Sequence, residues 1–230
     1  MRKNLMKPMV KSIGTAHIHH FRTLFRWTSV VLLVLQLGTA NAIDYRIDPQ
    51  ETIASFEVWM LGVVPIRGHF MHTTGAMRFD PASQVGQIEV LIDTTSVETN
   101  SERATAATRG PGFFNIERFP RMQFKSSRFV FAANRLNSIE GLLTLTGITQ
   151  PVTLAINHAT CKAAIAHERS VCRADAVVTI KRSTFGMKAW PHSVSDNVTI
   201  RISLVAFAES DEATAPPIPA TSPDDPKKPL

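Results

Sequence analysis

Hydrophobic and polar residues alternate along most of the chain after residue 50. The stretch 141–156 shows the pattern clearly, because its apolar side chains recur at every second position with threonines between them, at Leu143, Leu145, Val152, Leu154 and Ile156. Successive side chains of a β-strand point to opposite faces, so a period of two predicts a strand with one buried face. We expect a hairpin here, with its turn at residues 147–150. Leu142 then points outward, toward a covering helix or a dimer contact.

The same alternation predicts about eight or nine strands, in the segments 52–61, 64–70, 75–80, 87–93, 121–133, 136–147, 151–159, 173–181 and 197–207. It breaks over residues 95–110, which are rich in Thr, Ser and Ala, and where Ser101–Ala104 can begin a short helix. Antiparallel hairpins joined by short turns favour a sandwich or a closed barrel over a nucleotide-binding parallel sheet. Alternation alone does not separate these two all-β architectures.

The first 42 residues differ in character from the rest of the chain. They carry six Lys and Arg, no acidic residue, a short apolar run and the small-residue triplet Ala40-Asn41-Ala42. This order predicts a secretory signal peptide that is removed after Ala42, with an uncleaved anchor as the alternative. Residues 43–209 then form one domain, and the proline-rich residues 210–230 form a disordered tail. We expect the mature protein in the periplasm, with no integral membrane span after signal removal.

The net charge of +6 comes entirely from that leader, since the remaining residues carry 19 Lys and Arg against 19 Asp and Glu. A domain with balanced charge and no basic stripe gives no reason to expect nucleic-acid binding.

The two cysteines of the chain are Cys161 and Cys172. In an exported protein such a pair predicts a disulfide, here closing a loop of about 12 residues. A zinc site is poorly supported, because no second Cys or His pair has ligand spacing.

Catalytic motifs are missing from the sequence: it has no G-x-S-x-G, no H-E-x-x-H, no P-loop and no dinucleotide fingerprint. His69 and His72 would lie on opposite faces of a strand, which disfavours a shared metal ion. What remains is apolar, with aromatic side chains concentrated in the middle of the chain, at Phe113, Phe114, Phe119, Phe124, Phe129 and Phe131. These rings form either a plain core or the lumen of a barrel, and an eight-stranded barrel is wide enough for one small ligand.

Eight blocks of sequence, in order, resemble the YceI-like family of bacterial exported proteins, which are lipocalin-like and bind polyisoprenoids. The blocks are YRIDP from Tyr45, LGVVPIRGHF at 61–70, GAMRFDPA at 75–82, IDTTSVETNSER at 92–103, FFNIERFPRMQFKSS at 113–127, GLLTLTGITQPVTL at 141–154, IKRSTFGM at 180–187 and VSDNVTIRI at 194–202. The resemblance implies an all-β fold, an extended antiparallel eight-stranded lipocalin-like barrel with one short helix covering part of it. It also implies a hydrophobic tunnel that holds an isoprenoid chain, such as a polyprenyl or quinone tail, and no catalytic residues, metal or other cofactor. In this chain Met60 stands where the family often carries His, and the helix lacks the family's His-Leu pair.

The inward-facing positions are the expected walls of this tunnel. They are Phe56, Val58, Met60, Ile66, Phe70, Met77, Phe79, Phe113, Phe114, Phe124, Leu143, Leu145, Ile180 and Ile200. Arg67 and Arg182 are candidates for contact with a head group.

Non-enzymatic binding, transport or storage of an isoprenoid lipid is therefore the leading hypothesis. A stress-response or structural barrel with no ligand is the second, and a homodimer is compatible with either. A lipid- or amide-processing enzyme is the third, with Arg182, Ser183, His192 and Asp196 as the nearest approach to a catalytic cluster.

Overall fold

The computed structural model describes residues 42–163 and 169–209. The predicted signal peptide, apart from Ala42, and the predicted tail lie outside these residues. The elements are β1 (Ile43–Ile47), β2 (Ile53–Met60), β3 (Val64–Phe70), β4 (Thr73–Asp80), β5 (Val85–Asp93), a 3₁₀ turn η1 (Thr94–Ser96), β6 (Val97–Thr99), α2 (Glu102–Arg109), β7 (Arg121–Ala132), β8 (Arg135–Leu145), β9 (Ile148–Lys162), β10 (Val171–Lys181), a 3₁₀ turn η2 (Arg182–Phe185) and β11 (Val194–Ala208).

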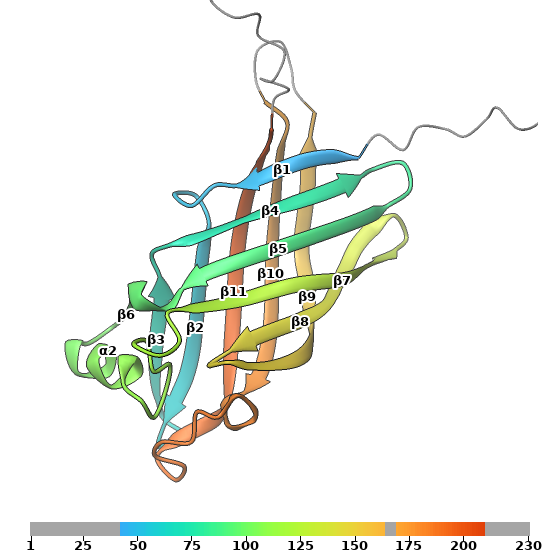
Figure 1. Cartoon of the computed structure of the whole chain (residues 1–230). Coiled ribbons are helices and arrows are strands. Elements are labelled where there is room, and N and C mark those ends of the chain that lie inside the picture. Colours follow the sequence, from blue (N-terminus) through green and yellow to red (C-terminus); the bar gives the residue numbers. More distant parts are fainter. Residues whose placement is uncertain (1–41, 164–168, 210–230) are drawn as a thin grey trace, which may run out of the picture. The chain divides into compact units, whose positions relative to one another are not determined.

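Eight of the strands close into an antiparallel barrel in the order β1-β4-β5-β7-β8-β9-β10-β11, because β1 pairs with β4 on one side and with β11 on the other. Figure 1 shows β4, β5 and β7 crossing in front of β9, β10 and β11. Closure depends on the length of β11, whose last residues pair with β1 while residues 194–203 pair with β2. Outside the barrel, the sheet continues from β11 through β2 and β3 to β6. The fold is the barrel, not the sandwich, and the expected all-β architecture with one short α-helix in the described residues is confirmed.

The 141–156 hairpin has the predicted buried face but a tighter turn. Leu145 pairs with Ile148, so the turn consists of Thr146 and Gly147 alone, with φ of 49° and 77°. Two consecutive positive φ angles are typical of the type I′ turn, whose twist matches that of the flanking strands. The expected turn at 147–150 is wrong in this detail, because residues from Ile148 onward already belong to β9. Leu142 is 49% exposed on the outer face.

A β-bulge in β7 changes which side chains face the interior. Phe124 pairs with Leu143 and is buried, but the register with β8 shifts between Ser126 and Arg128. An extra residue in one strand reverses the alternation beyond it. Phe129 and Phe131, an odd number of positions after Phe124, therefore face the same side as Phe124.

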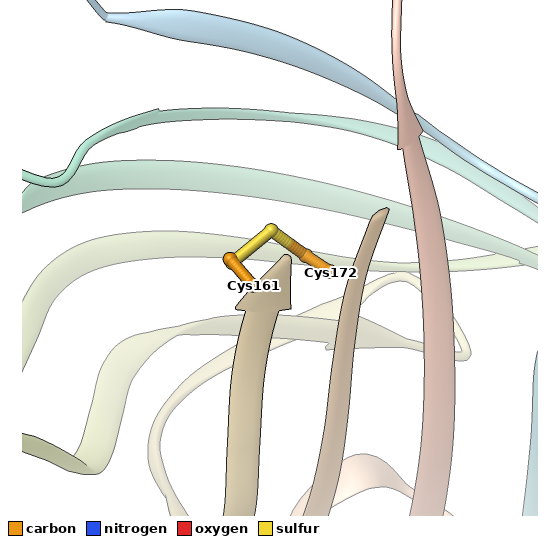
Figure 2. The surroundings of a disulfide bond; sticks show 2 residues. All are labelled: Cys161 and Cys172. Atoms are coloured by element: carbon orange, nitrogen blue, oxygen red, sulfur yellow. A yellow bond between two sulfur atoms is a disulfide. The ribbon is translucent and has the colours of Figure 1, made fainter. Parts of the chain in front are cut away.

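The Cys161–Cys172 disulfide joins the end of β9 to the beginning of β10 (Figure 2). The two cysteines are direct partners in the register of these strands, with an S–S distance of 2.01 Å. The predicted disulfide is thus present, and it links two adjacent barrel strands.

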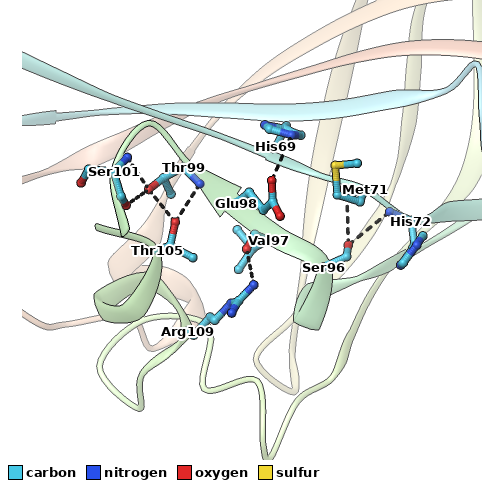
Figure 3. A network of polar contacts seen from close by, with 10 residues as sticks. All are labelled: His69, Met71, His72, Ser96, Val97, Glu98, Thr99, Ser101, Thr105 and Arg109. Carbon is cyan, nitrogen blue, oxygen red and sulfur yellow. Dashed lines mark hydrogen bonds and ion pairs between the residues drawn. The ribbon is translucent and has the colours of Figure 1, made fainter. Parts of the chain in front are cut away.

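The helix α2 begins at a clear cap. The Ser101 hydroxyl accepts a hydrogen bond from the Ala104 amide at 3.2 Å, which satisfies one of the free N–H groups of the first turn. At the other end, Arg109 donates to the Val97 carbonyl of β6 at 3.0 Å, as Figure 3 shows. The helix is therefore tied to the short strand that precedes it.

The segment formed by η1 and β6 is fixed to β3 and the turn after it by a small polar network (Figure 3). The Ser96 hydroxyl accepts hydrogen bonds from the amides of Met71 (3.1 Å) and His72 (3.2 Å). His69 pairs in register with Glu98, and their side chains lie 4.0 Å apart. The loop after α2 reaches the same part of the sheet, because its Phe114 ring packs against Phe56 of β2 and Phe70 of β3.

Candidate functional site

A cavity of about 640 Å³ lies inside the barrel, between β4, β5 and the strands from β7 to β11. Its inner wall is apolar and consists of Met77, Phe79, Ile88, Val90, Phe124, Phe129, Phe131, Leu136, Ile139, Leu154, Ile156, Ala176, Ile202 and Leu204. A volume of this size is within the range of about 300–1,000 Å³ typical of small-molecule sites. We call this space the large cavity.

Aromatic rings form one side of the large cavity. The Phe79 ring of β4 stacks against Phe129 and Phe131 of β7, with 6.2 Å between ring centroids in both pairs. Offset contacts of this kind are favourable beyond the apolar area that they bury. The stack presents a flat apolar surface to whatever occupies the cavity.

Polar side chains line the large cavity where the β7–β8 turn meets the ends of β9 and β10, at Asn134, Arg135, Asn137, Asn157, His158, Thr160 and Arg173. The disulfide contributes to the same wall, and Cys172 is buried. Arg173 is paired with Glu51 at 3.3 Å. Among the described residues that line the cavity there is no Asp or Glu, so these residues offer no acidic partner to a cationic ligand.

A second, smaller cavity of about 60 Å³ lies in the same interior, nearer η2. The rings of Phe56, Phe70 and Phe114 meet beside it, with centroids 5.5–5.8 Å apart. Phe114 and Phe113 come from the loop after α2, so this loop closes the interior at that end. We call this space the small cavity.

The two cavities lie end to end along the strands. On β7, Met122 lines the small cavity and Phe124 the large one, and on β11 Ile200 and Ile202 divide in the same way. Residues two apart on a strand share a face and are separated by only about 7 Å. The two spaces are therefore neighbouring parts of one apolar interior.

Arg182 is buried beside the small cavity, and each of its three side-chain nitrogens donates a hydrogen bond to the protein. Its guanidinium donates to the carbonyls of Ser195 (3.0 Å), Met187 (2.6 Å) and Val194 (2.9 Å). It also lies 5.7 Å from the centroid of the Phe113 ring. Burial lowers the pKa of Arg182, and Asp196 opposes that shift. These bonds hold the connection between β10 and β11 in place.

The other head-group candidate, Arg67, is exposed and lines neither cavity. Its Nε atom lies 2.7 Å from Glu57 Oε2 on the adjacent strand. A head group at this position would have to compete with that ion pair.

The sequence-predicted wall residues divide between the two cavities. Met77, Phe79 and Phe124 line the large cavity, whereas Phe56, Val58, Phe70, Phe113, Phe114, Leu145, Ile180 and Ile200 line the small one. Leu143 is buried in the core between them without lining either. Met60 and Ile66 are half-buried near the β2–β3 turn and line neither space.

Several wall residues of the large cavity were not among the predicted set. Phe129 and Phe131, for which the sequence left a plain core and a barrel lumen open, face the cavity because of the bulge in β7, which a strict period of two does not anticipate. Four other wall residues could have been predicted from the sequence, because each pair continues an alternating apolar face. They are Ile88 and Val90 of β5, and Ile202 and Leu204 of β11.

The nearest approach to a catalytic cluster is a structural contact. The Ser183 hydroxyl donates to Asp196 Oδ2 at 2.8 Å, and the Ser183 amide donates to Oδ1 at 2.9 Å. Within residues 42–163 and 169–209, no hydrogen bond connects His192 to either of them. The same residues contain no group of three His, Cys, Asp or Glu side chains that could hold a metal ion.

In the part of the chain that the structure describes, no helix has the length and apolar character needed to cross a membrane.

Comparison with known proteins agrees with this architecture. Residues 45–206 match the family described as the YceI-like domain. A UPF0312 protein of Yersinia pestis (strain Pestoides F) is 34% identical over 129 residues, which are 55% of this chain and 67% of the relative. The crystal structure of Burkholderia cenocepacia BcnA has a TM-score of 0.60 and 26% identity, covering 69% of this chain and 98% of its own.

A Saccharophagus degradans structure, titled as a polyisoprenoid binding domain implicated in plant cell wall breakdown, has a TM-score of 0.53 at 14% identity. It covers 73% of this chain and 99% of its own, and a likeness at that identity shows the fold alone. The family match spans nearly the whole barrel, from β1 into β11. The chain therefore belongs to the YceI-like family.

Proposed function

We propose that this protein binds the apolar chain of an isoprenoid lipid, a polyprenyl or isoprenoid quinone tail, inside its barrel and carries or stores it in the periplasm without chemical change. The observation that carries the proposal is the pair of adjoining apolar cavities, of about 640 Å³ and 60 Å³, within one barrel interior.

The energetics of such a site favour a long flexible chain. Each CH₂ group moved from water into an apolar wall contributes about 0.8 kcal/mol. Ordering of the chain offsets much of that gain, and because the polar side chains of the large cavity gather at one end, most of the interaction is left to apolar burial. Affinity would then depend on how completely the chain fits and only weakly on the head group.

The family and its neighbours support an isoprenoid as the occupant. The chain belongs to the YceI-like family, and a neighbour of the same fold is described as a polyisoprenoid binding domain.

A binding role also fits the chemistry of the described residues better than an enzymatic role. Nucleophilic catalysis by a serine needs a base that can take its proton. The Ser183 hydroxyl donates to the Asp196 carboxylate, but, despite partial desolvation, hydrogen bonds from the amide and hydroxyl of Ser183 hold the pKa of Asp196 below its ordinary value, which makes this carboxylate a weak base.

The periplasmic location is supported by the disulfide and by the signal-like leader. Disulfides persist in oxidising compartments and are rare in the bacterial cytosol. The Cys161–Cys172 bond lies in the wall of the large cavity, so the proposed site would depend on that compartment for its final form.

The test is extraction of the natively purified protein with organic solvent, followed by mass spectrometry of the lipids. A stoichiometric isoprenoid in the extract is the expected result. Protein from several hosts that yields no lipid, and that takes up no added polyprenol or isoprenoid quinone, would contradict the proposal and favour a barrel with a structural role.

A further inference from the structure

Five large apolar side chains are exposed at the end of the molecule formed by the β2–β3 turn and the segment between η2 and β11. Their exposed fractions are 40% for Trp59, 66% for Leu61, 73% for Val63, 47% for Val64 and 54% for Trp190. We call these five residues the apolar tip. Soluble proteins expose single apolar side chains commonly, but a group of them on adjoining segments marks an interaction site.

The two segments of the apolar tip are bonded to each other. The Leu61 amide donates to the Ser193 carbonyl at 2.7 Å, and the Trp59 amide donates to the Ser195 hydroxyl at 3.2 Å. Trp190 packs edge-on against Phe113, with 5.4 Å between centroids. The exposed side chains therefore belong to one braced surface.

Two of these exposed side chains belong to residues with a strained backbone conformation. Leu61 has a φ of 50° and Trp190 a φ of 47°, in the left-handed region where bulky residues are uncommon. Gly62 follows Leu61 with a φ of 71°, so residues 61 and 62 have the two positive φ angles of a type I′ turn. Such turns strongly favour Asn or Asp at the first position, and here the position is leucine. Strain at an exposed apolar residue is more typical of a binding surface than of a simple turn.

The charged side chain within the two segments of the apolar tip is a lysine. Residues 58–66 contain no charged side chain, and residues 184–195 contain Lys188 and no acidic residue. The acids that flank these segments are already engaged, Glu57 by an ion pair with Arg67 and Asp196 by two hydrogen bonds from Ser183. Among the described residues Lys188 has no ion-pair partner, and it is exposed.

We infer that the apolar tip is a docking site for a lipid surface that carries net negative charge. Tryptophan rings suit the boundary between head groups and acyl chains, and a lysine beside them is attracted to anionic head groups. The aliphatic side chains at the turn would enter the acyl region, where apolar burial drives binding. This surface is distinct from the barrel interior, although Trp190 touches Phe113, which lines the small cavity, so docking would bring that end of the interior to the membrane.

The positions of the tryptophans allow a direct test. The chain has three, Trp27 in the leader and Trp59 and Trp190 in the tip. In full-chain protein with Trp27→Phe, purified from exporting cells, the tryptophan fluorescence therefore comes from the apolar tip alone. It is mixed with vesicles of phosphatidylcholine or of phosphatidylcholine with phosphatidylglycerol, with and without brominated acyl chains. We expect a blue shift, quenching by the brominated lipid, and stronger binding to the anionic vesicles.

Matched variants separate the apolar tip from other exposed apolar residues. Leu61→Asn with Val63→Ser removes two tip side chains while placing Asn-Gly, the favoured pair, in the turn. Val85→Ser with Leu142→Ser removes two side chains of comparable exposure, 64% and 49%, from other strands. The first pair should weaken vesicle binding at least about tenfold and the second should leave it unchanged, while Lys188→Gln should lower the preference for anionic vesicles about fivefold.

Three results would overturn the inference. One is the absence of quenching by brominated lipid, and another is equal binding by the two double variants. The third is a lipid-independent blue shift that rises with protein concentration, together with dimers in sedimentation that Leu61→Asn/Val63→Ser abolishes, since the tip would then be a contact between two copies. Lipid content of the purified protein is measured in parallel and tests the barrel proposal separately.

Discussion

The ring of Phe129 on β7 lies directly over Gly86 on β5. A Cβ atom on Gly86 would come within 2.6 Å of Phe129 Cδ2 and closer still to Cε2, and all three of its nearest neighbours would be atoms of this ring. The absence of a side chain at Gly86 therefore lets the ring lie against the sheet and join the Phe79 stack in the wall of the large cavity. Glycine sets the width of the cavity at this point.

Gly86→Ala should force the Phe129 ring away from the sheet and into the large cavity. We expect a loss of about 1–3 kcal/mol in the free energy of unfolding, as for other overpacked positions, together with reduced lipid content. Urea denaturation and lipid extraction measure the two effects. Adding Phe129→Leu should restore part of the loss by removing the clash, and a double variant as unstable as the sum of the single changes would show that the ring is not the cause.

Replacing both cysteines by alanine should destabilise the barrel at the polar end of the large cavity. The cysteines are 11 positions apart, and the chain-entropy estimate for a loop of this size is about 3 kcal/mol. Thermal unfolding of the Cys161→Ala/Cys172→Ala variant measures the change. Reductant should lower the melting temperature of the natural protein and leave that of the variant unaltered, whereas an equal response of both would mean that the bond does not stabilise the fold.

Arg182→Lys should be strongly destabilising, because an ammonium cannot reach three carbonyls that a guanidinium satisfies together. We expect a loss of about 2–4 kcal/mol from the buried acceptors left without partners. Arg67→Lys is the matched control, since it changes an exposed ion pair and should cost less than about 1 kcal/mol. If Arg182→Lys folds normally but binds lipid less well, Arg182 acts on the ligand and not on the connection between β10 and β11.

Asp80 makes the stability of the β4–β5 turn depend on pH. Hydrogen bonds from the Ser83 hydroxyl and the Ala82 amide lower the pKa of Asp80 below its ordinary value of 3.8. The carboxylate therefore stabilises the folded state above that value, and the contribution is lost as the pH falls toward the lower folded pKa. The difference in unfolding free energy between the natural protein and Asp80→Asn should shrink between about pH 6 and pH 2. A difference independent of pH would contradict this assignment.

Alternation of apolar residues was enough to predict most strands and the buried face of the 141–156 hairpin, because that face follows directly from the period of two. The strand β6 has only three residues, too few to show a period, and the turn at Thr146 and Gly147 depends on backbone angles that the alternation does not contain. The choice of a barrel required the family resemblance, since closure is made by Tyr45 pairing with Ala208 across the whole chain.

The candidate site was predictable only in part, for the same kind of reason. Phe79 and Phe124 could be placed by parity, but Phe129 and Phe131 face the large cavity because of the bulge after Ser126. Arg182 was expected near a head group on sequence grounds, whereas its three carbonyl partners come from a segment that folds back onto it. Long-range contacts of this kind leave no periodic trace in the sequence.

The most direct test of lipid binding inside the barrel compares the same substitution on the two faces of one strand pair. Ala176 of β10 lines the large cavity, whereas Ala155 of β9 pairs with Val177 and is exposed on the outer face. Native mass spectrometry of each variant with a polyprenol or an isoprenoid quinone counts the bound lipid, with circular dichroism as the check on folding. We expect Ala176→Trp to be folded and empty, and Ala155→Trp to bind lipid like the natural protein. Equal lipid content in the two folded variants would contradict binding inside the barrel.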